Sequence, residues 1–286
     1  MNVLWAIQKM AVNDLDSSDM VEAIQSLGLR HEIVNVVPFD YGAIPDIDFD
    51  GTIIPYGGTN FIDKIYKSKP WACWFNDNFK YNLYLKHYGK HMFNSDGICM
   101  KMRDFSPSLY PKKEFLFIRP NLDLKEFAGN VVRAEDFAGW YRKVKDQGWM
   151  VNENTEIVVA QASKIDEEWR VFIVDSTPVS ASMYRKDHFM SKVADAPPKV
   201  YAFVEQMVDI WKPADVFVMD ICSLNGELYI LELGDMHSAG WYLSDKKAII
   251  KAVSDFAESE YEFCRMANPD ECQSIHIPSW LKDYAD

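Results

Sequence analysis

Hydrophobic and polar residues follow one another in a regular order along the first part of the chain. Short apolar runs at 2–7, 31–37 and 51–57 are typical of buried strands, while 16–29 carries its apolar residues at helical spacing. Ser17 or Ser18 would cap this helix. The order strand, helix, strand, strand predicts an open α/β sheet.

A Gly57-Gly58-Thr59-Asn60 turn joins the third strand to a helical segment at 61–68. Such a turn can leave backbone N–H groups free to bind an anion. Most Gly-Gly turns only change the direction of the chain, so both interpretations stay open here.

Aromatic and polar residues alternate over 71–109, with helical character at 79–89. The clusters around Trp74 and at Tyr81, Tyr84 and Tyr88 are more typical of packing than of a binding platform. Prolines at 107 and 111 mark a boundary with the next part of the chain.

The chain becomes rich in strands from residue 114 onward. Apolar runs of strand length lie at 114–120, 155–161, 168–175 and 178–185. Helices are expected at 135–146, 198–211 and 244–264.

Two apolar strands near the C-terminal end flank the turn signal Asn225-Gly226, and each ends in a carboxylate. A loop centred on Gly226 places Asp220 directly opposite Glu232, and strand alternation adds Leu228 and Ile230 to the same face. Both faces look buried. Two such carboxylates repel by up to about 4 kcal/mol at an effective dielectric near 20, so they need a proton, a basic partner or a metal cation. A divalent cation that carries phosphates is the preferred hypothesis.

Basic residues lie on strands and loops that could face these carboxylates. Arg119 shares strand parity with apolar residues of 114–120, Arg170 does so within 168–175, and Lys125 lies in a polar loop. An arginine on an apolar strand face requires an anion, and phosphate is a good match for its donors. Alternatively, Arg119 and Arg170 pair with Asp220, Glu232 or Asp235 in a structural network.

Composition narrows the class of protein without identifying it. The 286 residues are 48% hydrophobic and 26% charged, as in a globular protein, and the net charge of −13 argues against non-specific binding to nucleic acid. The charge does not exclude a nucleotide such as ATP. Five cysteines without a C-x-x-C pair predict buried free thiols, and no run reaches the roughly 20 apolar residues of a membrane span, so we expect a cytoplasmic protein.

The order of several weak motifs resembles that of ATP-grasp proteins. These motifs are Arg119-Pro with Lys125, Phe127 and Gly129, then EWRVF at 168–172, MYR at 183–185, the pair Asp220 and Glu232, and SAGWY at 238–242. The pattern is similar to a divergent clade, frequent in phage and bacterial genomes, in which an arginine replaces the first nucleotide-binding lysine. The resemblance implies an α+β ATP-grasp fold, with two subdomains that clasp ATP, preceded by an α/β pre-ATP-grasp domain.

The resemblance also implies boundaries and roles. We expect the N-terminal domain at 1–110, the ATP-grasp domain at 111–265 and a tail at 266–286. Arg119 and Lys125 would hold the α- and β-phosphates, and Arg170 the γ-phosphate or an acyl phosphate, with Lys125 and Arg170 acting in catalysis. The connector that faces adenine would comprise Val159, Ala160 and Gln161.

The same resemblance implies a magnesium site at the two paired carboxylates. Asp220 and Glu232 would be its ligands. Many ATP-grasp enzymes have Glu-x-Asn where this chain has Glu232-Leu233-Gly234, so the third ligand would be Asp235 or a water molecule.

Family members typically activate a carboxylate with ATP, release ADP and let an amine attack the acyl phosphate. The resemblance therefore implies a carboxylate–amine ligase that acts on a peptide, protein or small molecule. The alternatives are an ATP-binding assembly or regulatory factor without turnover, and a kinase. The residues expected to contact the acceptor are Tyr184, Arg185, His237 and Ser238, although His237 is equally typical of a turn.

Overall fold

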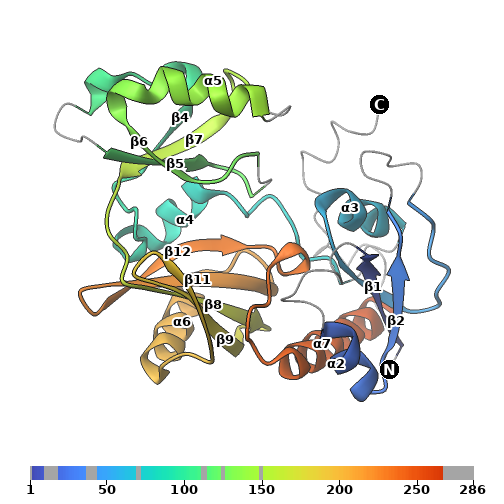
Figure 1. Ribbon diagram of the computed structural model, residues 1–286. Coiled ribbons are helices and arrows are strands. Elements are labelled where there is room, and N and C mark those ends of the chain that lie inside the picture. The colour runs from blue at the N-terminus through green and yellow to red at the C-terminus, as the bar shows by residue number, and fades with distance from the viewer. Residues whose placement is uncertain are drawn as a thin grey trace.

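The computed structural model describes residues 2–9, 19–36, 44–68, 72–110, 115–123, 126–147 and 151–266. Their strands form three sheets, and Figure 1 shows the two antiparallel sheets stacked on the left and the parallel N-terminal sheet to their right. Lys125 and the expected tail beyond Met266 lie outside the described residues.

The N-terminal sheet is parallel and has the order β2-β1-β3. Its strands are β1 (Val3–Gln8), β2 (Arg30–Val34) and β3 (Thr52–Tyr56). The helices α2 (Met20–Ser26) and α7 (Lys246–Met266) lie against one face, and α3 (Thr59–Ser68) lies against the other. Burial on both faces explains why the strands read as continuous apolar runs.

A four-stranded antiparallel sheet has the order β4-β7-β5-β6. Its strands are β4 (Ile98–Lys101), β5 (Phe115–Pro120), β6 (Asn130–Arg133) and β7 (Glu156–Gln161). Helix α5 (Phe137–Gln147) covers the face that carries Leu116 and Ile118. Because β4 pairs with β7, the strand at 98–101 belongs with strands beyond residue 111 rather than with the N-terminal sheet.

A five-stranded antiparallel sheet has the order β10-β9-β8-β11-β12. Its strands are β8 (Glu167–Val174), β9 (Thr177–Lys186), β10 (Phe189–Ala194), β11 (Val216–Leu224) and β12 (Glu227–Gly234). Helix α6 (Pro198–Ile210) packs on one face, and α4 (Tyr81–Tyr88) packs along the edge strand β12. Short 3-10 helices connect these elements: η2 (Gly89–His91), η3 (Met102–Asp104), η4 (Pro107–Leu109), η5 (Ala134–Asp136) and η6 (Met236–Ser238).

The cysteines only partly follow the expectation of buried free thiols. Cys222 is free and buried, Cys73 is partly exposed and Cys99 is exposed. Cys264 is disulfide-bonded, which corrects the expectation that the thiols are all free. In the part of the chain that the structure describes, no helix combines the length and apolar character needed to cross a bilayer.

Helix α7 carries a carboxylate with an unusual environment. The Glu260 carboxylate accepts a hydrogen bond of 3.0 Å from the Trp74 indole. Burial, with a smaller contribution from the charges of Asp215 and Asp175, raises the pKa of Glu260 to about 7. The folded protein therefore holds a proton there that the unfolded chain has already released.

We predict that this proton makes stability depend on pH. Since the pKa of Glu260 is higher in the folded state, its contribution is greatest below about pH 4.5 and is lost as pH rises towards 7. Glu260→Gln should remove this loss and stabilise the protein at pH 8 by on the order of 1 kcal/mol. Urea unfolding at pH 5 and pH 8 measures the effect, and an equal change at both pH values would contradict it.

Candidate functional site

The β11–β12 hairpin places its two carboxylates as the sequence predicts. Asn225 and Gly226 form the turn with φ values of 52° and 86°, and the register pairs Asp220 with Glu232 directly. Positive φ at both positions is typical of the turn type that Asn-Gly favours in hairpins. The prediction of adjacent carboxylates is therefore confirmed.

A β-bulge corrects the predicted faces of this hairpin. The register shifts after Asp220, so that Ile221 pairs with Ile230. Ile230 consequently lies on the face opposite Asp220, in a core with Met219, and Leu228 packs against that same core. The prediction that Leu228 and Ile230 share the face of Asp220 was wrong, because an extra residue in one strand inverts the alternation beyond it.

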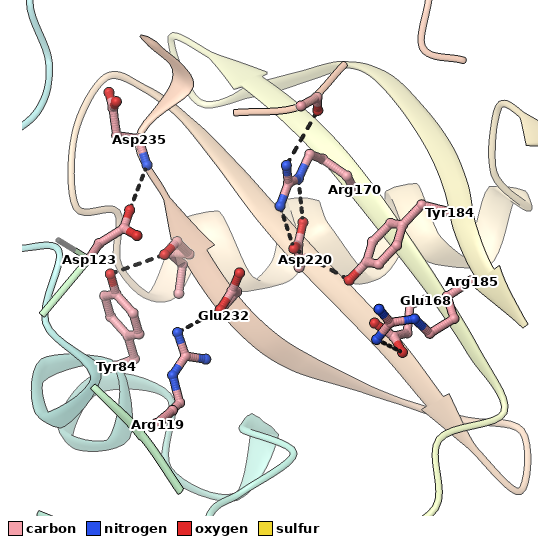
Figure 2. A network of polar contacts seen from close by, with 12 residues as sticks. Tyr84, Arg119, Asp123, Glu168, Arg170, Tyr184, Arg185, Asp220, Glu232 and Asp235 are labelled. Carbon is pink, nitrogen blue, oxygen red and sulfur yellow. Dashed lines mark hydrogen bonds and ion pairs between the residues drawn. The ribbon is translucent and has the colours of Figure 1, made fainter. Parts of the chain in front are cut away.

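Arg170 of β8 lies directly opposite Asp220 and binds it with two parallel hydrogen bonds. Its Nε and Nη2 donate to the two carboxylate oxygens at 2.8 and 2.7 Å, as Figure 2 shows, and Nη1 donates to the Gly240 carbonyl at 3.3 Å. Burial opposes the charge on the guanidinium, but Asp220 outweighs it and raises the pKa of Arg170. The Asp220 side chain is only 3% exposed, so the pair is buried.

Arg119 of β5 reaches from the four-stranded sheet to Glu232 on the five-stranded sheet. Its Nη2 lies 2.5 Å from Oε2 of Glu232. Burial disfavours the guanidinium charge, yet Glu232 raises the pKa of Arg119. Its Nε is buried and has no hydrogen-bond partner, so one donor of Arg119 is available for a further acceptor.

These contacts realise the ion-pair network that the sequence left open as an alternative. Each carboxylate of the hairpin has an arginine partner, so a metal ion or a phosphate must take the place of some of these contacts. Even with Arg170 beside it, burial together with the charges of Glu232 and Glu168 raises the pKa of Asp220. The positive charge in the network therefore falls short of what Asp220 requires, and a cation would be favoured.

The same face carries a carboxylate that the sequence interpretation missed. Glu168 is 3% exposed and shares strand parity with Arg170, which was the available signal. Arg185, expected to contact an acceptor, donates to Glu168 at 3.2 Å. Tyr184, also expected there, donates to Asp220 at 3.4 Å and stacks on Tyr242 with ring centroids 4.8 Å apart.

Asp235 does not join the other two carboxylates. Its side chain caps η6 by accepting hydrogen bonds of 3.1 Å from the backbone of His237 and of Ser238, and Figure 2 shows it directed away from Glu232. Among the described residues, no three His, Cys, Asp or Glu side chains are gathered as a metal site. The expectation that Asp235 is the third ligand is therefore not supported.

His237 has both ring nitrogens engaged. Its Nδ1 lies 2.7 Å from the Pro55 carbonyl oxygen, and its Nε2 accepts a hydrogen bond of 3.1 Å from the Trp74 backbone. The ring is fully buried and stacks on Trp74. These contacts favour the interpretation of His237 as a turn residue that joins η6 to the N-terminal sheet.

The Gly57-Gly58 turn is also occupied by protein groups. The backbone of Gly57 donates to the His237 carbonyl at 2.9 Å, and that of Gly58 donates to the Gln8 side chain at 2.6 Å. These two N–H groups are not free to bind an anion, which leaves the interpretation of a simple turn.

The proposed connector residues occupy the last positions of β7. Ala160 pairs with Phe117 of β5, whereas Val159 packs into the core beneath α5. Gln161 donates its backbone N–H to Asp96 at 3.1 Å. From Gln161 the chain passes to β8, so this segment does connect the two antiparallel sheets.

Comparison with known proteins identifies the fold. A family model described as an ATP-grasp domain of clade family 3 matches residues 56–253. The comparison with curated proteins found no match.

Solved structures with similar folds are ligases of low sequence identity. A D-alanine–D-alanine ligase from Bacillus anthracis has a TM-score of 0.58 at 13% identity, over 92% of this chain and 99% of that one. The D-cycloserine synthetase DcsG has a TM-score of 0.60 at 12% identity, over 89% and 99%. The ATP-grasp ligase PsnB, complexed with a precursor peptide and AMPPNP, has a TM-score of 0.53 at 11% identity, over 90% and 97%. Since the family model spans more than half of its residues, the chain belongs to this family of ATP-grasp domains.

Proposed function

We propose that this protein is an ATP-dependent carboxylate–amine ligase. The observation that carries the proposal is the register of β8, β11 and β12, which sets Asp220 beside both Arg170 and Glu232 at the junction of the two antiparallel sheets. Membership of the ATP-grasp family supports it. Such an enzyme would use the ATP of the cytoplasm.

In this proposal, the arginines hold the phosphates of ATP. Arg119 has an unpaired Nε and lies between the two sheets, which suits the α- and β-phosphates. Lys125, in the loop after β5, would assist it. Arg170 would bind the γ-phosphate, and the backbone of Val159, Ala160 and Gln161 would face adenine.

The donor set suits magnesium on two carboxylates. Magnesium is commonly held by one or two carboxylates together with phosphate oxygens and water. Asp220 and Glu232 would hold it here, and once bound it would offset the charge of the phosphates. The arginines released from the carboxylates would then be free for those phosphates.

The proposed reaction needs charge stabilisation rather than a protein nucleophile. The substrate carboxylate oxygen attacks the γ-phosphorus, the bond to the β-phosphate oxygen breaks, and ADP leaves. An amine then attacks the acyl carbon of the acyl phosphate, inorganic phosphate departs with the bonding electrons, and the amine loses a proton. Arg170 stabilises the transferring phosphoryl group. Tyr184 and Arg185 lie beside it and would contact the acceptor.

Incubation of the protein with ATP, magnesium and pools of amino acids and peptides tests the proposal. We expect acceptor-dependent formation of ADP and phosphate in equal amounts, with a new amide detected by mass spectrometry. A phosphorylated product with ADP alone would indicate a kinase instead. Tight binding of ATP without turnover would indicate a binding factor.

Glu232→Gln should separate two kinds of nucleotide binding. Loss of the carboxylate charge weakens the competitor for Arg119, so ATP without metal should bind at least as tightly as to the parent. The increase in affinity that magnesium produces should fall roughly tenfold, as for the loss of about 1.4 kcal/mol. Calorimetric titration with and without magnesium measures both, and Glu227→Gln, at the exposed start of β12, is the control. An unchanged magnesium effect would remove Glu232 from the metal site.

Asp220→Asn should affect stability as well as turnover. The substitution leaves Arg170 buried with a neutral partner, which costs about 3 kcal/mol. We therefore expect a lower unfolding temperature together with loss of magnesium-dependent ATP turnover. A variant that is as stable as the parent would show that the Arg170 pair contributes little to the fold.

A further inference from the structure

Helix α4 lies where the two antiparallel sheets meet, between β5 above and β12 below (Figure 1). Its N-terminal end is attached to the segment after β5. The backbone N–H of Tyr81 donates to the Asn121 carbonyl at 2.8 Å, and that of Asn82 donates to the Asn121 side chain at 2.9 Å. The position of α4 is therefore tied to the end of the strand that carries Arg119.

Tyr81 forms one wall of the Arg119 environment. The guanidinium carbon lies over the Tyr81 ring, 4.6 Å from its centroid, and the Tyr81 side chain is almost completely buried. A guanidinium stacked face-on is held by the ring without using its N–H groups, which lie in the guanidinium plane. Tyr81 can thus hold Arg119 while its donors remain available for an anion.

Tyr84, one turn farther along α4, reaches the other half of the site. Its hydroxyl donates to the Leu233 carbonyl at 3.2 Å, next to Glu232 in β12, as Figure 2 shows. The rings of Tyr81 and Tyr84 lie 5.8 Å apart. One helix therefore contacts both the arginine of β5 and the strand that carries the carboxylate.

We propose that Tyr81 is a positioning residue for nucleotide binding, which keeps the Arg119 guanidinium in place when Glu232 releases it. The inference rests on the proposed function, in which the phosphates of ATP take over the Arg119 donors. It changes the expectation for the α4 tyrosines from packing alone to packing with a role in the site.

The electrostatic character of the ring distinguishes this role from packing. Tyr81→Phe retains the ring face and should bind ADP with magnesium within about threefold of the parent. Tyr81→Leu loses the ring and should bind about tenfold more weakly. Tyr88→Leu is the matched control, because Tyr88 is equally buried on the same helix but donates to the Trp211 carbonyl. It should lower the unfolding temperature without changing nucleotide affinity.

Phenylalanines with one and three ring fluorines at position 81 test the same idea if Tyr81→Leu does not fold. They keep the size of the ring and weaken its attraction for a cation, so affinity for ADP should fall as fluorines are added. Equal affinity across this series, or equal weakening by Tyr88→Leu, would overturn the role of Tyr81 alone. Absence of nucleotide binding by the parent protein would overturn the proposed function as well.

Discussion

The ion pair between Arg119 and Glu232 is the contact on which the rest of the site depends. It joins β5 of the four-stranded sheet to β12 of the five-stranded sheet at a distance of 2.5 Å. The neighbouring pair of Arg170 with Asp220 lies entirely within the larger sheet. Two arginines and two carboxylates therefore balance one another at the junction of the sheets, and any phosphate or metal must enter by exchanging these partners.

This arrangement explains how an acidic protein can offer a site for a strongly negative ligand. A buried arginine without a partner would be unstable, and the carboxylates supply that partner. The exchange is favourable when a cation and an anion arrive together, because each takes one half of an existing pair. Tyr81 fits this scheme, since its ring holds Arg119 from the side that no anion needs.

The structure also shows how the site is attached to the N-terminal sheet. His237 and Trp74 form a stacked pair whose polar atoms bind the backbone at Pro55 and at each other's segments. Asp235, which the sequence suggested as a metal ligand, caps the same turn. Residues just after the carboxylate strand thus serve the connection between parts of the fold, rather than the chemistry.

Local patterns in the sequence determined most of the strands, the long helices and the pairing of Asp220 with Glu232, because alternation and an Asn-Gly turn act over a few residues. Three strands escaped detection, namely β4, β6 and β10, and each is an edge strand with few buried residues to reveal it. The β-bulge after Asp220 and the choice of arginine partners were settled only by tertiary structure. Those features depend on which strands and side chains meet across the chain, and no local pattern records such encounters.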